Sequence, residues 1–136
     1  TTVMNHVSRL DVPIIQVGIR SLDEEEAKEA EEAGIISFPA EFEKADLIKE
    51  TKEKDVYLTI DMDVLDPSKA PGVSNPEPAG LSLNTLMEIV KSIAESSNIV
   101  GFDLVEVCPP HDHGNATSTL AAKILLETIT VLYKKK

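Results

Sequence analysis

The sequence predicts an α/β chain with three layers, in which helices cover both faces of a mainly parallel sheet. Short apolar segments of strand length alternate with longer segments whose apolar residues recur at helical spacing. The strand segments are apolar on both faces, which is typical of parallel strands buried between helices. The chain has 136 residues, enough for one domain with its own core. We therefore expect a single α/β domain.

Capping residues and a glycine mark the elements in the first half of the chain. Ser21 and Glu24 have the spacing of a capping box, so the acidic segment 23–32 is expected to be a helix that ends at Gly34. The predicted elements are, in chain order, the end of a helix at 3–10, a strand at 13–19, the acidic helix, a strand at 35–38, a helix at 41–54 with Phe42, Ala45 and Ile48 on one side, and a strand at 56–60.

A long irregular loop opens the second half of the chain. Residues 66–80 contain four prolines and two glycines, too many for the interior of a helix or a strand. Loops of this length in compact domains are commonly functional. The elements after it are a helix capped by Ser82 that buries Leu86, Ile89, Val90 and Ile93, a strand at 99–107, and a helix at 117–133 that buries Leu120, Ile124, Leu125, Ile129 and Leu132.

The charge of the chain argues against two classes of partner. Thirteen basic and 24 acidic residues give a net charge of −11, which disfavours nucleic acid and anionic membrane surfaces and favours a cationic ligand. No apolar run approaches the roughly 18 residues that a membrane span needs. Cys108 is the single cysteine, so no internal disulfide is possible. A reducing, cytoplasmic compartment is therefore expected.

Acidic residues follow two of the predicted strands. Ligands of parallel α/β proteins bind beyond the carboxyl ends of the strands, and this sequence places Asp61, Asp63 and Glu106 there. Three carboxylates at one edge repel each other unless protons, cationic side chains or metal ions neutralise them. Alternate residues of a strand point to the same side, so Asp61 and Asp63 are expected to reach one divalent ion or to share two. In the alternative interpretation, these aspartates only cap the following loop through Asx-type hydrogen bonds.

Two families have an apolar strand that ends in Asp-x-Asp. Residues 61–64 resemble the motif of the haloacid dehalogenase superfamily, in which the first aspartate is a phosphorylated nucleophile and the second an acid/base. That motif lies near the start of its domain, whereas several elements precede it here. Residues 57–82 resemble the signature of the ureohydrolases, the arginase and agmatinase family, over a much longer stretch. Residues 17–20 and 101–112 resemble further blocks of that family, and the blocks look most like those of prokaryotic, particularly archaeal, agmatinases.

The ureohydrolase resemblance implies a function for the acidic edge. By this resemblance, Asp61 bridges two manganese ions, Asp63 binds one of them, and Glu106 holds the guanidinium group of a small cationic substrate. A metal pair lowers the pKa of a bridging water, so that hydroxide is present near neutral pH and can attack the guanidinium carbon. We expect hydrolysis of agmatine to putrescine and urea by a homo-oligomer. The alternatives are arginine or another guanidino acid as substrate, a dehalogenase-like phosphotransferase, and a non-catalytic relative.

Several residues of the ureohydrolase pattern have no counterpart in this chain. By the resemblance, a histidine after paired glycines, an Asp-x-His-x-Asp motif and a proton-shuttling histidine are expected before Thr1. Residues 1–136 are therefore interpreted as the carboxyl-terminal part of a single ureohydrolase domain, with a partial arginase-like fold. We expect this segment to be inactive by itself. Ala79 stands where a glycine is common in the family.

Four residues outside the acidic edge have both a functional and a structural interpretation. His111 and His113 alternate and can chelate a second metal ion, but histidines of a solvated loop have the same pattern. Arg20 either forms an ion pair with an acidic neighbour or contacts the substrate. Cys108 is interpreted as a small buried side chain rather than a nucleophile, because no histidine partner can be assigned to it.

Overall fold

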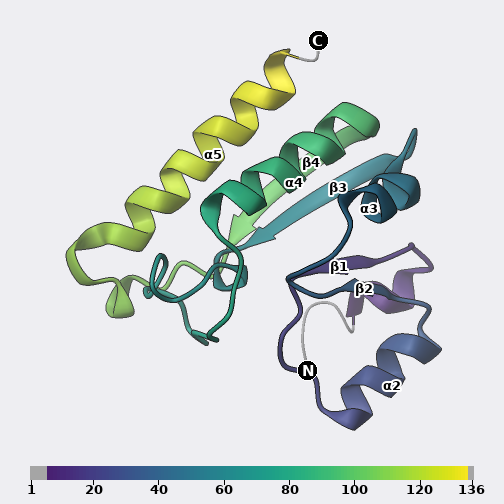
Figure 1. The fold of residues 1–136 in the computed structure, drawn as a ribbon, viewed down its shortest axis with the longest axis horizontal. Helices are drawn as coiled ribbons and strands as arrows, with labels where there is room; N and C mark the ends of the chain where they lie inside the picture. The colour runs from purple at the N-terminus through teal and green to yellow at the C-terminus, as the bar shows by residue number, and fades with distance from the viewer. Residues whose placement is uncertain (1–5, 135–136) are drawn as a thin grey trace. The chain divides into compact units, whose positions relative to one another are not determined.

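The computed structural model describes residues 6–134 and contains two compact units, Thr1–Phe42 and Glu43–Lys136. Each unit has two parallel strands joined through a helix, as Figure 1 shows. The predicted α/β class with parallel pairing is therefore confirmed, and the single domain stays a prediction. Among the described residues, no helix combines the length and apolar content needed to cross a membrane.

The first unit is built on two short strands. A 3-10 turn at Ser8–Leu10 precedes β1 (Ile15–Val17), and helix α2 (Glu24–Glu32) leads to β2 (Ile36–Phe38). Strand β1 is shorter than the predicted 13–19 because its partner β2 has only three residues. Residues 3–5 of the first predicted helix lie outside the described part of the chain.

Helix α2 begins two residues later than the capping box predicts. Its N-cap is Asp23, whose Oδ1 accepts the backbone N–H of Glu26 at 2.8 Å. The prediction that Ser21 caps this helix is wrong, because the aspartate carboxylate satisfies the same kind of orphan N–H group nearer the acidic turn. Gly34 has φ +69°, the left-handed conformation that ends a helix, so the predicted stop is confirmed.

The second unit contains the longer strands and helices. Helix α3 (Lys44–Thr51) precedes β3 (Asp55–Asp61), and a 3-10 turn at Met62–Val64 follows this strand directly. After the long loop come α4 (Leu83–Ser96) and β4 (Asn98–Val105). Short 3-10 turns at Pro109–His111 and His113–Asn115 lead into α5 (Ala116–Lys134). Strand β4 pairs with β3 in parallel, from Asp55 opposite Asn98 to Asp61 opposite Val105.

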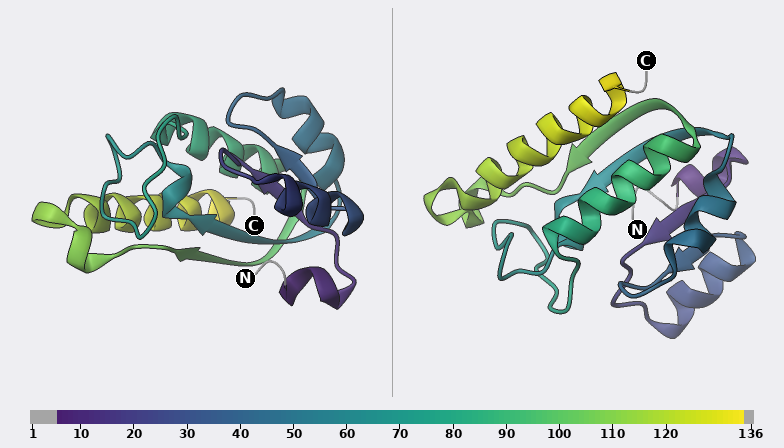
Figure 2. Two further views of the ribbon diagram at one scale, coloured as in Figure 1. Left: turned by 90° about the horizontal axis from the view of Figure 1, so that it is seen from below. Right: turned by 45° about the horizontal axis from the view of Figure 1, so that its top comes forward.

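Within residues 43–134, helices cover one face of the β3–β4 pair. Figures 1 and 2 show α4 and α5 running beside each other along this pair. Even-numbered residues of β3 are less exposed than odd-numbered ones, and Tyr57 on the other face is 63% exposed. Helices were expected on both faces of the sheet, but in the described part of this unit they cover one face. The side chains of β3 accordingly alternate between less and more exposed, as in a strand with one face in solvent.

Two predicted helix faces differ from the structure, and one agrees with it. Helix α4 buries the predicted Leu86, Ile89, Val90 and Ile93, and Ser82 caps it by accepting the backbone N–H of Thr85 at 3.0 Å. Helix α3 buries Leu47 and Thr51, while Ala45 is exposed. The buried residues of α5 are Thr117, Ala121, Ile124 and Thr128, so Ile124 is the one member of the predicted face among them, and Ile129 is 52% exposed.

Candidate functional site

The three predicted acidic residues lie at the same end of the β3–β4 pair. Asp61 is the last residue of β3 and is paired with Val105, the last residue of β4, so Glu106 follows at the same edge. Asp63 lies in the 3-10 turn directly after β3. Parallel pairing therefore brings together carboxylates that are far apart in the sequence, as the strand-end argument predicts.

Asp61 and Asp63 are connected by a local hydrogen bond. The backbone N–H of Asp63 donates to Oδ1 of Asp61 at 3.0 Å, so the Asx-type cap that the sequence left as an alternative is present. Strand alternation is not what places the two side chains, because β3 ends at Asp61 and Asp63 lies in the following 3-10 turn. The Asp63 side chain nevertheless lies close enough to Asp61 to raise the pKa of that residue. A carboxylate has several lone pairs, so this cap is compatible with metal binding by the same side chain.

The electrostatics of Asp61 reflect crowding of negative charge. Burial raises the pKa of Asp61 to about 6, and the negative charges of Asp63 and Glu106 add to this effect. The N–H group of Asp63 acts in the opposite direction by stabilising the charged form. A partly buried carboxylate that resists ionisation next to two others favours a bound cation, and oxygen ligands of this kind suit hard divalent ions.

The fit to a metal is partial in the described part of the chain. Asp61 and Asp63 are the two carboxylates of this edge that could ligate an ion. Residues 6–134 do not bring three His, Cys, Asp or Glu side chains together in a group that could hold a metal. The donor set is therefore compatible with divalent ions, and further ligands must come from water or from another polypeptide segment.

Glu106 has an unusual backbone conformation, which the sequence did not predict. Its φ is +63°, in the left-handed region that non-glycine residues rarely adopt. Two residues later, the N–H of Cys108 donates to the carbonyl of Gly72 at 2.8 Å, which ties this part of the chain to the long loop. Such backbone strain persists where surrounding contacts determine the conformation, and it is frequent at functional sites.

Asp66 closes the base of the long loop. Its Oδ1 accepts the N–H of Ser68 at 2.9 Å and its Oδ2 accepts the N–H of Ala79 at 3.0 Å. These hydrogen bonds lower the pKa of Asp66, those from Ser68 most strongly. The N–H of Asp66 donates to the carbonyl of Leu81 at 3.1 Å, beside the bridge between Leu65 and Leu81. The Asp-Pro dipeptide at 66–67 was a sequence signal for this turn.

The middle of the same loop contacts the segment between β4 and α5. Gly72 donates its N–H to Oγ1 of the buried Thr117 at 2.8 Å. The ring Nδ1 of His111 lies 3.1 Å from the carbonyl oxygen of Val73. The carboxylate of Asp112 accepts the N–H groups of Thr117 and Ser118 in the first turn of α5. His111 thus contacts the loop backbone. Within residues 6–134 it does not belong to any group of three His, Cys, Asp or Glu side chains that could hold a metal.

Arg20 and Cys108 are the remaining candidate residues. Arg20, in the first unit, donates from Nη1 to the carbonyl of Gly18 at 3.1 Å, and its ion pair with an acidic neighbour stays a prediction. Cys108 is a partly buried free thiol, in line with its interpretation as a small packed side chain.

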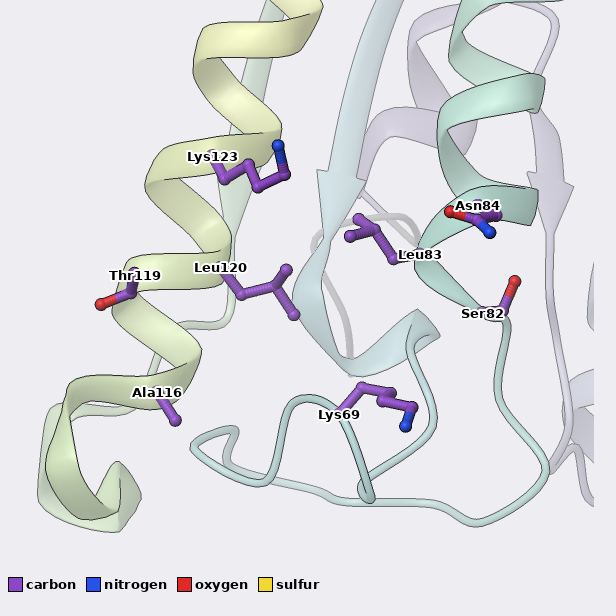
Figure 3. A pocket seen from close by; sticks show the side chains of 8 residues that line it. All are labelled: Lys69, Ser82, Leu83, Asn84, Ala116, Thr119, Leu120 and Lys123. Carbon is purple, nitrogen blue, oxygen red and sulfur yellow. The ribbon is translucent and has the colours of Figure 1, made fainter.

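A separate hollow of about 560 Å³ lies between the start of α4 and the first turns of α5, as Figure 3 shows. Lys69 of the loop and Lys123 of α5 line it, and Lys123 is ion-paired with Glu127. None of the three candidate acidic residues lines this hollow.

The structure thus has parallel strands with an acidic edge beyond their carboxyl ends, which is the place where open α/β proteins bind their ligands. The Arginase family model matches residues 1–130, and the chain belongs to the arginase family. An agmatinase of Halalkalibacterium halodurans is 40% identical over 121 residues, which cover 85% of this chain and 41% of that protein. The chain thus spans about two fifths of the length of this curated relative.

Solved structures of the family have the same fold. The agmatine ureohydrolase of Thermoplasma volcanium is 32% identical with a TM-score of 0.77, over 89% of this chain and 42% of that one. The arginase of Bacillus caldovelox is 31% identical with a TM-score of 0.72, over 90% of this chain and 43% of that one. The partial arginase-like fold predicted from the sequence is therefore confirmed.

Proposed function

We propose that this chain forms the carboxyl-terminal part of a manganese-dependent ureohydrolase domain that hydrolyses agmatine to putrescine and urea. The proposal rests on the position of three carboxylates at one edge of the β3–β4 pair, those of Asp61, Asp63 and Glu106. The similarity to an agmatinase over 85% of the chain supports the choice of substrate. The likeness to an arginase structure makes arginine the second candidate.

Each acidic residue has a separate role in this proposal. Asp61 and Asp63 hold manganese, since carboxylate oxygens suit such ions and the crowding of charge around Asp61 disfavours the ion-free state. When bound, a metal pair supplies Lewis acidity and a reactive water near neutral pH. Glu106 binds the guanidinium group, because a planar cation pairs with a carboxylate through two parallel hydrogen bonds. Binding at Glu106 orients the guanidinium carbon toward the edge that carries the aspartates.

The chain by itself supplies two of the ligands of such a site, so we propose that residues 1–136 alone bind manganese weakly and release no urea. Titration calorimetry with Mn²⁺ tests the assignment. Asp61→Asn removes a charge yet keeps an oxygen that can accept the N–H of Asp63, so it is expected to abolish the weak binding without unfolding the turn. Glu106→Gln is the matched control and is expected to retain Mn²⁺ while losing the interaction with agmatine.

Two results would contradict this assignment. If Glu106→Gln weakened Mn²⁺ binding as much as Asp61→Asn, the separate roles of the acidic residues would be wrong. If the chain bound two ions tightly and released urea, its interpretation as part of a site would be wrong. A preference of the complete ureohydrolase for arginine over agmatine would change the substrate assignment and leave the proposed chemistry in place.

We also propose that the chain belongs to one ureohydrolase domain, acts in the cytoplasm and self-associates. The free thiol of Cys108 supports a reducing compartment. Exposed apolar side chains on α5, with Leu126 66% and Tyr133 79% exposed, support self-association. Light scattering on the purified chain measures its mass in solution, and a monomer at all concentrations would contradict the oligomer.

A further inference from the structure

We propose that Thr117 is a positioning residue for Glu106 and acts through Gly72. The inference rests on the proposed role of Glu106 in guanidinium binding, but the structural relationship stands on contacts of its own. Thr117 is fully buried in the first turn of α5 and has no direct place at the acidic edge. Its hydroxyl is connected to that edge by two hydrogen bonds in series.

The first hydrogen bond connects α5 to the long loop. Oγ1 of Thr117 accepts the N–H of Gly72 at 2.8 Å, between residues 45 positions apart. The contact is tight, because a Cβ at Gly72 would lie 2.7 Å from Cβ of Asp112 and 2.9 Å from Oγ1 of Thr117. Only glycine fits such a close approach. The position of the loop backbone is therefore determined by the start of α5.

The second hydrogen bond connects the loop to the end of β4. The carbonyl of Gly72 accepts the N–H of Cys108 at 2.8 Å, so both polar groups of this glycine are used. Glu106, two residues before Cys108, leaves the strand with φ +63°. A non-glycine residue keeps this conformation only where its surroundings impose it. Glu106 is held between the strand register at Val105 and the anchored Cys108.

The start of α5 is itself firmly fixed. The carboxylate of Asp112 accepts the N–H groups of Thr117 and Ser118 at 2.9 and 2.8 Å, which satisfies two orphan donors of the helix. Helix α5 also packs against α4. A rigid helix thus determines the position of Gly72, and Gly72 determines the exit of the chain after β4.

This arrangement matters for a carboxylate that recognises a guanidinium group. Two parallel hydrogen bonds form only when both planar groups share a plane, so the direction of the Glu106 side chain decides the affinity. A shift of φ at Glu106 redirects its Cα–Cβ bond and spoils that alignment without removing the charge. Loss of the Thr117 hydroxyl is therefore expected to weaken agmatine binding and to leave the two aspartates unaffected.

The test is NMR on the full 136-residue chain with variants at two buried threonines of α5. Thr117→Val removes the acceptor of the Gly72 N–H, and Thr117→Ser retains it. Thr128→Val is the matched control, because Thr128 is equally buried on the same helix and lies away from the loop. The readouts are amide exchange at Gly72 and Cys108, the φ-dependent coupling between HN and Hα of Glu106, and titration with agmatine.

In Thr117→Val, exchange at Gly72 and Cys108 is expected to accelerate by about 5- to 10-fold, as for loss of one net hydrogen bond. The Glu106 coupling is expected to change, and agmatine to shift the Glu106 signals less than in the wild type. Thr117→Ser is expected to restore all three readouts. Thr128→Val is expected to leave the Glu106 coupling and the agmatine titration unchanged and not to accelerate exchange at Gly72 or Cys108. Where Thr117→Val does not fold, Thr117→Ala makes the same comparison with a smaller side chain.

Three outcomes overturn the positioning role: an unchanged Glu106 coupling in Thr117→Val despite faster exchange at Gly72, no restoration by Thr117→Ser, or equal effects of Thr128→Val. Failure of the proposed function gives a different pattern. If agmatine shifts no Glu106 signal in the wild type while the coupling still responds to Thr117→Val, Thr117 positions Glu106 and the substrate assignment is wrong.

Discussion

Tyr57 donates its hydroxyl hydrogen to Oδ2 of Asp103 at 3.0 Å, across the two parallel strands on their solvent-exposed face. Thr59 donates to the other oxygen, Oδ1, at 2.5 Å, so the carboxylate of β4 is held by two hydroxyl groups of β3. The ring of Tyr57 lies over Gly101, where a Cβ would be 2.9 Å from the ring. This cluster secures the strand register close to the paired residues Asp61 and Val105.

Replacement of Asp103 by asparagine is expected to lower the pKa of Tyr57. The hydrogen bond to Asp103, followed by the negative charge of that carboxylate, raises the pKa of Tyr57 above its ordinary value of 10.0, because both favour the protonated phenol. Asp103→Asn keeps an acceptor and removes the charge. The chain has two tyrosines, so an absorbance titration in a Tyr133→Phe background reports the phenolate of Tyr57 alone. Thr59→Val is the control and is expected to leave the pKa of Tyr57 raised; equal pKa values with and without the Asp103 charge would contradict the pairing.

Replacement of Asp112 by asparagine is expected to reduce the pH dependence of stability in acid. Hydrogen bonds from Ser118 and Thr117 lower the pKa of Asp112, those from Ser118 most strongly. A carboxyl group with a lowered folded-state pKa stabilises the fold above its unfolded pKa of about 3.9, and the stabilisation is lost as the pH falls through the folded value. The free energy of unfolding of Asp112→Asn is therefore expected to be lower than that of the wild type at neutral pH. This difference in stability is expected to become smaller below about pH 4. Urea unfolding at several pH values measures it, and a constant difference would exclude this linkage.

Removal of one buried hydroxyl on α5 is expected to stabilise the chain, whereas removal of another destabilises it. Thr128 is fully buried, and its Oγ1 has no hydrogen-bond partner among the described residues. Thr128→Val is expected to raise the free energy of unfolding by about 1 kcal/mol, because the desolvation cost of the hydroxyl disappears. Thr117→Val leaves the N–H of Gly72 without its acceptor, and is expected to lower the free energy by about 1–2 kcal/mol. Denaturant unfolding measures the change in free energy for each variant when the m-values are unchanged. A loss of stability in both variants would contradict the predicted opposite effects.

At two adjacent loop positions, glycine is expected to give a more stable chain than alanine. Ala79 has φ +63°, and the left-handed conformation costs a non-glycine residue roughly 1 kcal/mol. Ala79→Gly is therefore expected to stabilise the chain by up to about 1 kcal/mol. Gly80→Ala would place a Cβ 2.5 Å from the backbone N of Asp66, and is expected to destabilise by about 1–3 kcal/mol. Thermal unfolding distinguishes the two, and a stabilising Gly80→Ala would show that the loop base is adaptable.

Local features of the sequence were sufficient to predict most elements and the place of the acidic edge. The alternation of apolar segments predicts the parallel α/β class, and the Ser82 cap with its 3.6-residue periodicity predicts α4 and its buried face. The convergence of Asp61, Asp63 and Glu106 also follows from the sequence, because the carboxyl ends of parallel neighbours lie at one edge. Each of these inferences needs only neighbouring residues or a general rule of topology.

Tertiary structure decided the features that depend on packing between distant segments. Helix α5 is apolar on most of its surface, so periodicity did not select its buried face. In the structure Thr117 and Thr128 are buried and Ile129 is exposed. The exposed face of β3 likewise depends on which helices lie beside it. The left-handed Glu106 and its link to Thr117 through Gly72 join segments 45 residues apart. No local pattern encodes such a contact, because its energy arises only when the loop, strand end and helix have already come together.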